Sequence, residues 1–356
     1  MYDSYMAERN TLRKIEGHWG WVIPGLLLVS LIANIFGLIL PFLEIDEAFH
    51  DKIIYSLPHS VELMWQKELY FISILILVFS IIFPFMKLFS LIAIWFLPWK
   101  SKNRERYLHV IELLGKWSYM DIFIVILLLS LTSDQSNIAS TVHIGAHFFI
   151  GAITLSMITS EIITTLARKQ YETELPAKQF PTKRRWMLID NIYLGWIVPV
   201  LVFASAIALI ESLHATFLRI SQLFLVSHSY SINQIGIVLQ EEKHWVLLII
   251  LAGTLFVVPM LRLALLLGTW LIPLHEQKHI KVKQLIDVLS RWCMLDVFGL
   301  ALFLITTEGK ELVKTEIQPG LYVVVTAIGL SYFLGLIAVM LNKLMIAKAN
   351  RVTEGS

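Results

Sequence analysis

The chain repeats its own pattern of residues at one constant offset of 175 positions. Trp21 and Pro24 in the first half recur as Trp196 and Pro199 in the second. The same offset relates these further pairs: Pro84 and Pro259, Lys87 and Arg262, Trp95 and Trp270, Trp117 and Trp292, Asp121 and Asp296, and Gly145 and Gly320. An offset kept over so long a stretch predicts a tandem duplication of a whole folding unit, because the repeats of a solenoid are far shorter.

The composition is typical of a protein that lies in a membrane. Hydrophobic residues make up 57% of the chain and charged residues 16%, with a mean hydropathy of +0.70. Soluble domains contain about 45–50% apolar and about 25% charged residues. We therefore expect an all-α integral membrane protein that does not bind nucleic acid. The single cysteine, Cys293, excludes an internal disulfide, a CxxC redox pair and a cysteine-based zinc ribbon.

Eight stretches are long and apolar enough to cross a bilayer, which takes about 20 residues of helix. They are 19–41, 69–97, 113–133 and 144–167 in the first copy, and 194–212, 244–272, 288–307 and 319–343 in the second. The sequence thus predicts two tandem four-helix transmembrane modules. Because each copy has an even number of spans, both copies have the same orientation, which makes this a parallel repeat.

The segments between the spans define the expected domain organisation. The stretch 168–190 is charged and contains Pro176 and Pro181, so we interpret it as a linker between the modules. The expected order is a cytoplasmic N-terminal segment (1–18), a first transmembrane module (19–167), the cytoplasmic linker (168–190), a second transmembrane module (191–345) and a cytoplasmic tail (346–356).

Basic residues predict which side of the membrane each loop occupies. Of the 29 Lys and Arg residues, 21 lie in the two termini and in one set of alternate loops. Positive charge concentrates on the cytoplasmic side, so both termini should be cytoplasmic. On the opposite side, 42–68 and 213–243 should fold on the membrane surface, and the short connectors 134–143 and 308–318 suit hairpins.

Two basic residues lie inside predicted spans. Lys87 and Arg262 each follow a proline by three positions, in Pro84-Phe-Met-Lys87 and Pro259-Met-Leu-Arg262. Counting back from Leu97 places Lys87 about 15 Å from the end of its span, near the bilayer midplane. A charge at that depth costs at least about 2.5–3.5 kcal/mol, so it must face protein or water and is a candidate for function.

Asp121 and Asp296 are the matching acids on the next span of each copy. Helical rise places these carboxylates about 12 Å deep, which is close to the depth of the bases. We therefore expect Lys87–Asp121 and Arg262–Asp296 pairs, in which each charge offsets the burial cost of the other. Two interpretations stay open at this point: inert pairs that fix the register of the helices, or a polar relay or gate in a transport path.

Other polar residues give weaker signals. Ser331 and its counterpart Ser156 lie in the fourth span of each copy, where a hydroxyl contributes either to helix packing or to a polar network. His143 and His147 are four residues apart, but two histidines do not make a metal site. No phosphate-binding loop, catalytic serine or histidine motif, or dinucleotide fingerprint occurs, so we expect no cofactor, no metal, no catalytic residue and no enzymatic activity.

Two motifs resemble those of a known family. Gly115-Lys-Trp-Ser-Tyr-Met-Asp121-Ile-Phe123 and Ser290-Arg-Trp-Cys-Met-Leu-Asp296-Val-Phe298 resemble the Gly-Arg-Trp-Ser-Met-Leu-Asp-Val-Phe motif of the paraquat-inducible protein A (PqiA) family. The Pro84…Lys87 and Pro259…Arg262 elements match that family's Pro-x-x-Lys element, and Pro319-Gly320-Leu-Tyr322 is similar to its Pro-Gly-x-Gly-x-Tyr stretch. The resemblance covers nearly all of 19–345.

The resemblance implies a function and a partner. In this family a two-module subunit of the bacterial inner membrane works with a partner that carries mammalian cell entry (MCE) domains, and the pair moves lipids between the inner and outer membranes. The resemblance assigns Lys87, Asp121, Arg262 and Asp296 to a polar network in the transmembrane core. The chain departs from the family in lacking cysteine-rich zinc ribbons. Two alternatives are a scaffold that anchors an MCE tunnel without moving lipid, and a lipid-modifying enzyme, for which no nucleophile–base set is evident.

Overall fold

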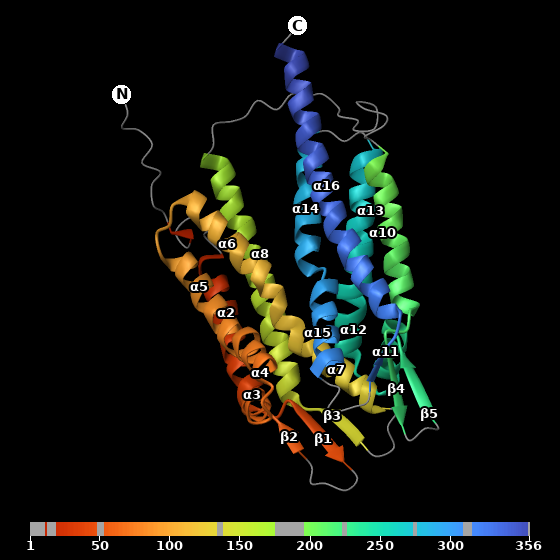
Figure 1. Cartoon of the computed structure of the whole chain (residues 1–356). Coiled ribbons are helices and arrows are strands. Elements are labelled where there is room, and N and C mark those ends of the chain that lie inside the picture. Colours follow the sequence, from red (N-terminus) through yellow and green to blue (C-terminus); the bar gives the residue numbers. More distant parts are fainter. Residues whose placement is uncertain are drawn as a thin grey trace. The chain divides into compact units, whose positions relative to one another are not determined.

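The computed structural model describes residues 11–12, 19–47, 53–133, 138–174, 196–222, 226–272, 276–308 and 315–354. The chain divides into two compact units, Met1–Lys178 and Gln179–Ser356 (Figure 1). Most of the predicted N-terminal segment lies outside the described residues. The predicted linker begins inside a helix that continues to Glu174, and its remaining residues, 175–190, lie outside the described part of the chain.

The first unit contains helices α2 to α8 and strands β1 to β3. In chain order these are α2 (Trp19–Ile39), β1 (Leu43–Glu47), β2 (Ile53–Tyr55), α3 (Leu57–Gln66), α4 (Tyr70–Ile76), η1 (Leu77–Ile82), α5 (Phe83–Phe96), α6 (Ser101–Gly115), η2 (Lys116–Tyr119), α7 (Met120–Ser133), β3 (Ile138–Val142) and α8 (Ile144–Glu174). Here η1 is a π-helix and η2 a 3₁₀-helix.

The second unit repeats this order. It contains α10 (Ile197–His214), β4 (Leu218–Gln222), β5 (Val226–Tyr230), α11 (Ile232–Glu241), α12 (Trp245–Ala252), the π-helix η3 (Gly253–Val257), α13 (Val258–Leu271), α14 (Glu276–Trp292), α15 (Leu295–Glu308), β6 (Thr315–Ile317) and α16 (Gly320–Glu354). Apart from η2, which has no counterpart between α14 and α15, the elements of the two units occur in the same order, which agrees with the duplication in the sequence.

Eight helical segments within the described residues are long and apolar enough to span a membrane, four in each unit. They are Gly20–Ile39, Tyr70–Phe96, Asn103–Ser133, Ile144–Gln170, Ile197–His214, Trp245–Leu271, Ile280–Thr307 and Gly320–Leu341. The protein is therefore a helical membrane protein built from two four-helix modules. The third span of each module starts earlier than predicted, because it also includes part of the amphipathic helices α6 and α14.

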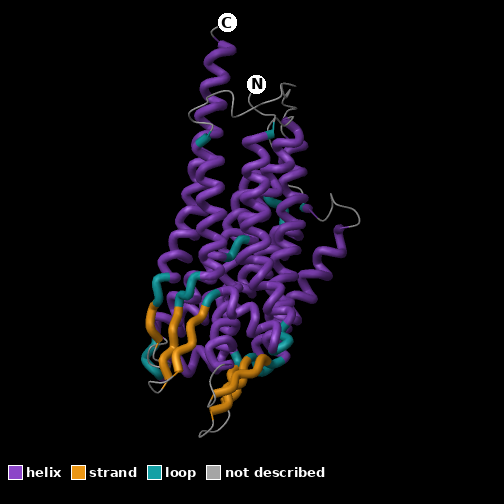
Figure 2. Tube along the Cα trace, turned by 90° about the vertical axis from the view of Figure 1, so that its right-hand side faces the viewer, coloured by secondary structure: helices purple, strands orange, loops and turns teal. Residues whose placement is uncertain are grey.

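Each unit also carries a small antiparallel sheet at one end of its helices, drawn in orange in Figure 2. The strand order is β2-β1-β3 in the first unit and β5-β4-β6 in the second. Leu43 pairs with both Tyr55 and Val142, and its counterpart Leu218 pairs with both Tyr230 and Ile317. The duplication has thus preserved the register. The described residues of the connectors 134–143 and 308–318 supply β3 and β6, while 134–137 and 309–314 lie outside the described residues.

A duplicated glycine joins each sheet to its fourth helix. The Gly145 amide donates to the carbonyl of Pro41, and the Gly320 amide donates to the carbonyl of Thr216, both at 3.0 Å. A Cβ at either position would overlap the carbonyl oxygen that the glycine binds. Only glycine lets the two segments approach this closely, which explains why Gly145 recurs as Gly320.

A strained turn connects α3 to the second span in the first unit, and an equivalent turn connects α11 to the second span in the second unit. Glu68 follows α3 with φ 64° and Lys243 follows α11 with φ 61°, although neither is a glycine. The offset between them is again that of the repeat. Side chains are disfavoured in this left-handed region, so the turn has been kept at a cost in both units.

Candidate polar site in the membrane interior

A π-helix and a proline precede the basic residue in the second span of each module. Pro84 follows η1 and Pro259 follows η3, each at the start of the next α-helix. A proline has no N–H to donate to the carbonyl four residues earlier, and its ring crowds that carbonyl. The wider π turn accommodates the ring, and such turns are frequent at functional sites. Lys87 and Arg262 follow these prolines by three residues.

Lys87 is enclosed by three helices of the first unit. Its side chain is only 3% exposed, and its Nζ donates a 3.1 Å hydrogen bond to Ser156 Oγ on α8. Nζ also lies against α6, because a Cβ at Gly115 would be 3.2 Å from it. The negative charge of Glu112, one turn earlier on α6, acts on the ammonium group. The hydrogen bond that holds the ammonium group is thus the one to Ser156, with Glu112 nearby on α6.

Arg262 has the equivalent hydroxyl partner in the second unit. Its Nη1 donates a 2.8 Å hydrogen bond to Ser331 Oγ on α16. The guanidinium lies against Gly335, one turn further along α16, where a Cβ would be 3.3 Å from Nη2. The position equivalent to Gly335 in the first unit is Ser160. The module with the larger arginine side chain thus has a glycine where the module with lysine has a serine.

The third span of each module is broken just before its acid. In the first unit η2 interrupts the helix, and in the second unit Cys293 and Met294 are not helical. Asp121 consequently lies in the first turn of α7, and Asp296 in the first turn of α15. The N-terminus of a helix carries partial positive charge and stabilises an anion there. The break thus supplies a local compensation for a carboxylate inside the membrane.

The π-helix holds this break in place by a backbone carbonyl. In the first unit the Ser118 hydroxyl donates to the carbonyl of Phe79 at 3.4 Å. In the second unit the amide of Met294 donates to the carbonyl of Thr254, also at 3.4 Å. Phe79 and Thr254 are equivalent residues of η1 and η3. In both modules the π-helix of the second span is therefore in contact with the break of the third.

The two acids have different neighbours. The Ser80 hydroxyl of η1 lies beside the buried carboxylate of Asp121, and Asp121 Oδ2 has no hydrogen-bond partner of normal geometry among the described residues. In the second unit the Tyr332 hydroxyl of α16 donates to Asp296 Oδ2. Leucine and methionine, Leu255 and Met157, occupy the positions equivalent to Ser80 and Tyr332.

These contacts correct the expected pairing of acid and base. Within the described part of the chain, Lys87 and Arg262 each donate to a serine, and neither is joined to Asp121 or Asp296. The sequence predicts that the base and the acid of each module lie at similar depths in the membrane. Depth, however, does not fix the direction in which a side chain points. The structure brings Ser331 to Arg262 and Ser156 to Lys87. Sequence reasoning missed Gly335 and Tyr332, although Gly335 could have been found by comparing the copies around the lysine-to-arginine change.

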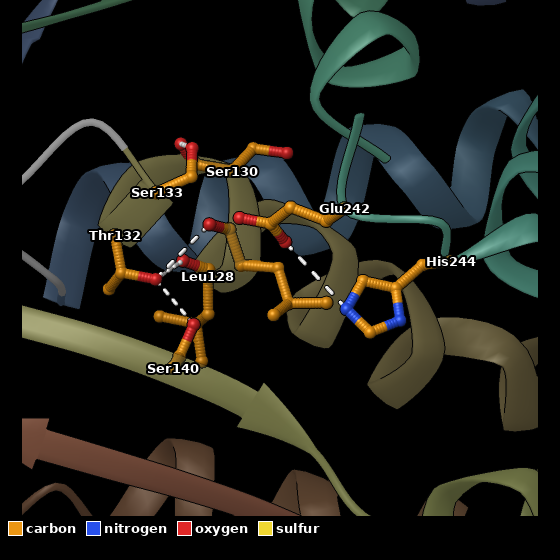
Figure 3. Close-up of polar contacts among 8 residues, drawn as sticks. Leu128, Ser130, Thr132, Ser133, Ser140, Glu242 and His244 are labelled. Carbon is orange, nitrogen blue, oxygen red and sulfur yellow. Dashed lines mark hydrogen bonds and ion pairs between the residues drawn. The ribbon is translucent and has the colours of Figure 1, made fainter. Parts of the chain in front are cut away.

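Further polar contacts lie outside this site. Tyr119 and Thr154 bond through their hydroxyls at 2.8 Å, which links η2 to α8. At the end of α7, the Thr132 hydroxyl contacts Ser140 and the carbonyl of Leu128 (Figure 3). In the second unit, His244 Nε2 lies 3.7 Å from Glu242 Oε2 (Figure 3).

The two histidines that lie four residues apart in the sequence have different partners. His143 precedes α8, and its Nε2 lies 2.7 Å from Glu44 Oε2 on β1. His147 is one turn into α8, and its Nδ1 is directed to the carbonyl of His143 at 3.3 Å. No group of three or more His, Cys, Asp and Glu residues that could hold a metal occurs among the residues with described positions.

Comparisons with known proteins identify relatives. A model of the family "Paraquat-inducible protein A" matches residues 23–167 and 197–340, one match for each module. A protein of Haemophilus influenzae described as "Probable intermembrane transport protein" is 32% identical over 111 residues, which cover 30% of this chain and 27% of the relative. The chain is thus aligned to about a quarter of that relative's length. No solved structure gives a significant match.

Proposed function

This chain belongs to the paraquat-inducible protein A family, and we propose that it is the inner-membrane subunit of an MCE-type system that moves lipids between the inner and outer membranes. It acts without chemical catalysis. Its partner is a periplasmic tunnel protein with MCE domains, as the family resemblance implies. The name of the Haemophilus influenzae relative, "Probable intermembrane transport protein", supports the transport part of this proposal.

One observation carries the proposal: the contact between a base and a hydroxyl recurs in the interior of both modules. Charged side chains in a membrane interior cost at least about 2.5–3.5 kcal/mol each, and such residues commonly mark transport paths. A passive anchor gains nothing from carrying two of them. Their retention in both copies, together with an acid at a helix N-terminus in each, supports a polar relay or gate.

The contacts suggest how such a gate works. In each module the base connects the second and fourth spans, while in the second module Tyr332 connects the fourth span to the acid of the third. Hydrogen bonds from charged donors contribute about 1.5–3 kcal/mol each. A free-energy input of similar size is therefore enough to break these hydrogen bonds and let them form again. The sequence contains no nucleotide-binding motif, so we assign that input to the partner or to an ion gradient.

The proposal is tested with Asp121→Asn and Asp296→Asn. Asparagine keeps the shape of the side chain and removes its charge. Both variants should insert and co-purify with the MCE-domain protein at wild-type levels, yet fail to support lipid transfer from donor vesicles to that partner and fail to maintain outer-membrane integrity in cells. If both variants transfer lipid like the wild type, the charges are structural and the alternative function, an anchor for the tunnel, replaces this one.

A further inference from the structure

The fourth span of the second module has an uncovered face that its counterpart in the first module lacks. Val325, Tyr332, Leu336 and Val339 lie on one side of α16 and are 57%, 54%, 71% and 54% exposed. In the first module the equivalent Ile150, Met157 and Thr164 of α8 are 6%, 7% and 5% exposed, and Glu161 is half-buried. The same helix face is thus covered in one module and open in the other.

The difference arises from the helix that precedes the acid. In the first module α6 packs along α8, and α5 also contacts α8. In the second module α14 packs on α13, while neither α13 nor α14 has comparable packing against α16. Within its own module α16 rests mainly on α10 and α15. The open face of α16 is therefore equivalent to the face of α8 that α6 covers in the first module.

Arg262 lies at the edge of this open face, and among the described residues no carboxylate pairs with it. Ser331 and Gly335 contact the Arg262 guanidinium, and they directly precede Tyr332 and Leu336 in the sequence. Among the described residues, the hydrogen-bond partner of the guanidinium is the Ser331 hydroxyl, and Nε has none. Lys87 differs, because the charge of Glu112 acts on it. On α15, Asp296 accepts a hydrogen bond from Tyr332.

From this arrangement we infer that the second module binds a phospholipid, with its phosphate on Arg262 and an acyl chain along Val325, Tyr332, Leu336 and Val339 of α16. A guanidinium presents several N–H donors in a plane that matches two phosphate oxygens, which lysine cannot do. Because Gly335 has no side chain, the guanidinium can lie directly against α16, beside the open face. The inference deepens the proposed function and rests on it, because it names the substrate class and the module that receives the substrate.

The arrangement also gives the two modules different roles. In the first module Lys87 is enclosed, Ser160 replaces Gly335, and α6 covers the helix face. That module has no room for an acyl chain on the equivalent side. The second module has an arginine, a glycine and an open helix face where the first has a lysine, a serine and a covered face. These three differences favour lipid binding in the second module alone.

Photocrosslinking tests this site directly. The photoreactive residue p-benzoylphenylalanine replaces Leu336, and the purified protein is reconstituted in vesicles of phosphatidylethanolamine and phosphatidylglycerol that contain ³²P-labelled phospholipid. We expect labelled adducts at Leu336, and Arg262→Gln should lower their yield several-fold while Arg262→Lys retains part of it. Phe203, which is exposed on α10, reports ordinary surrounding lipid, so its adducts should not depend on Arg262. Glu161 is the matched position in the first module and should give few adducts.

Two outcomes would overturn the inference. Equal yields at Leu336 with and without Arg262 would mean that surrounding lipid alone covers α16, and crosslinks to protein in place of lipid would mean that a partner covers it. If Arg262→Gln does not fold, Gly335→Leu serves instead, because its side chain would fill the space beside Nη2. The assay measures occupancy and not transfer, so a failure here is distinguishable from a failure of the transport proposal, which the aspartate variants test.

Discussion

Lys87 donates its hydrogen bond to a serine 69 positions away, and Arg262 donates to a serine at the same separation. The duplication has therefore kept a specific contact between the second and fourth spans while the base itself changed. Interhelical packing alone would not require this, because any small residue lets helices approach. The conserved element is a hydroxyl that accepts from a cation inside the membrane.

Ser156→Ala and Ser331→Ala should destabilise their modules. Hydrogen bonds between membrane helices contribute about 0.6 kcal/mol on average and up to about 1.7, and a charged donor raises the value, so we expect a loss of about 1–2 kcal/mol. Unfolding of the purified protein in mixed micelles with increasing dodecyl sulfate measures this. Ser212→Ala is the control, since among the described residues that buried hydroxyl bonds to the carbonyl of Leu209, in its own helix. A loss at Ser212 as large as at Ser156 would count against the prediction.

Gly335→Ala should impair the second module through Arg262. The new Cβ would be 3.3 Å from Nη2, so the guanidinium must shift away from Ser331. Gly25→Ala on α2 is the matched control, because a Cβ there meets nothing within 4 Å. That control should be neutral or stabilising, since alanine exceeds glycine in helix propensity by about 1 kcal/mol.

A second variant shows whether the effect passes through the guanidinium. Combining Gly335→Ala with Arg262→Lys should restore part of the lost thermal stability, because the lysine lacks the Nη2 group that the new methyl meets. Thermal denaturation followed by intrinsic tryptophan fluorescence suits this comparison. If the double variant is as unstable as the sum of its single changes, Gly335 acts on some other neighbour.

Glu68→Gly and Lys243→Gly should each stabilise the protein. Both residues have positive φ, a conformation that costs a non-glycine residue about 1–2 kcal/mol and that glycine adopts readily. The neighbouring residues Lys67 and Glu242 have φ −82° and −79°, so glycine there should give no gain. Parallel unfolding curves for the four variants check this. A loss of stability at Glu68 or Lys243 would show that the side chain makes a contact worth more than the strain.

The number of spans and their pairing in modules could be predicted from the sequence, because apolar runs and one constant offset are local features. The two sheets could not. β1 pairs with β3 about a hundred positions further on, and its sequence, Leu43-Glu-Ile-Asp-Glu47, contains three acids. Strand pairing between such distant segments is decided by the helices that bring them together, so local propensity gave no signal.

The polar site was predicted in part. Proline, base, acid and serine were identified from their recurrence, and the structure brings each base to its serine. The direct ion pairs were an inference from depth on unbroken helices. The break before Asp121 and before Asp296 changes both the direction of the carboxylate and its need for a cation, since the helix N-terminus offsets part of its charge. A 3₁₀ turn inside an apolar stretch leaves no clear mark in the sequence.

The orientation of the chain is a prediction from its basic residues. In a Cys293→Ser background, Lys281→Cys on α14 should react with a membrane-impermeant maleimide only after the cells are permeabilised, because cytoplasmic loops carry most of the Lys and Arg. His59→Cys on α3, whose side chain is 48% exposed, should react in intact cells. Reaction of Lys281→Cys in intact cells would reverse the orientation.

A double-mutant cycle distinguishes the observed hydroxyl contact from a direct acid–base pair. Residues in contact show coupling energies of about 0.5–3 kcal/mol, whereas separate sites add to within about 0.3–0.5. Lys87→Met with Ser156→Ala should therefore show coupling in the higher range. Both changes remove the same hydrogen bond, so the second change costs little once the first has been made. Lys87→Met with Asp121→Leu should be close to additive, since the two side chains are not joined in the structure. The same stability assay serves both cycles. Strong coupling in the second cycle and none in the first would support a direct Lys87–Asp121 ion pair. Lys87 would then connect the second span to the third by an inert pair, and not to the fourth.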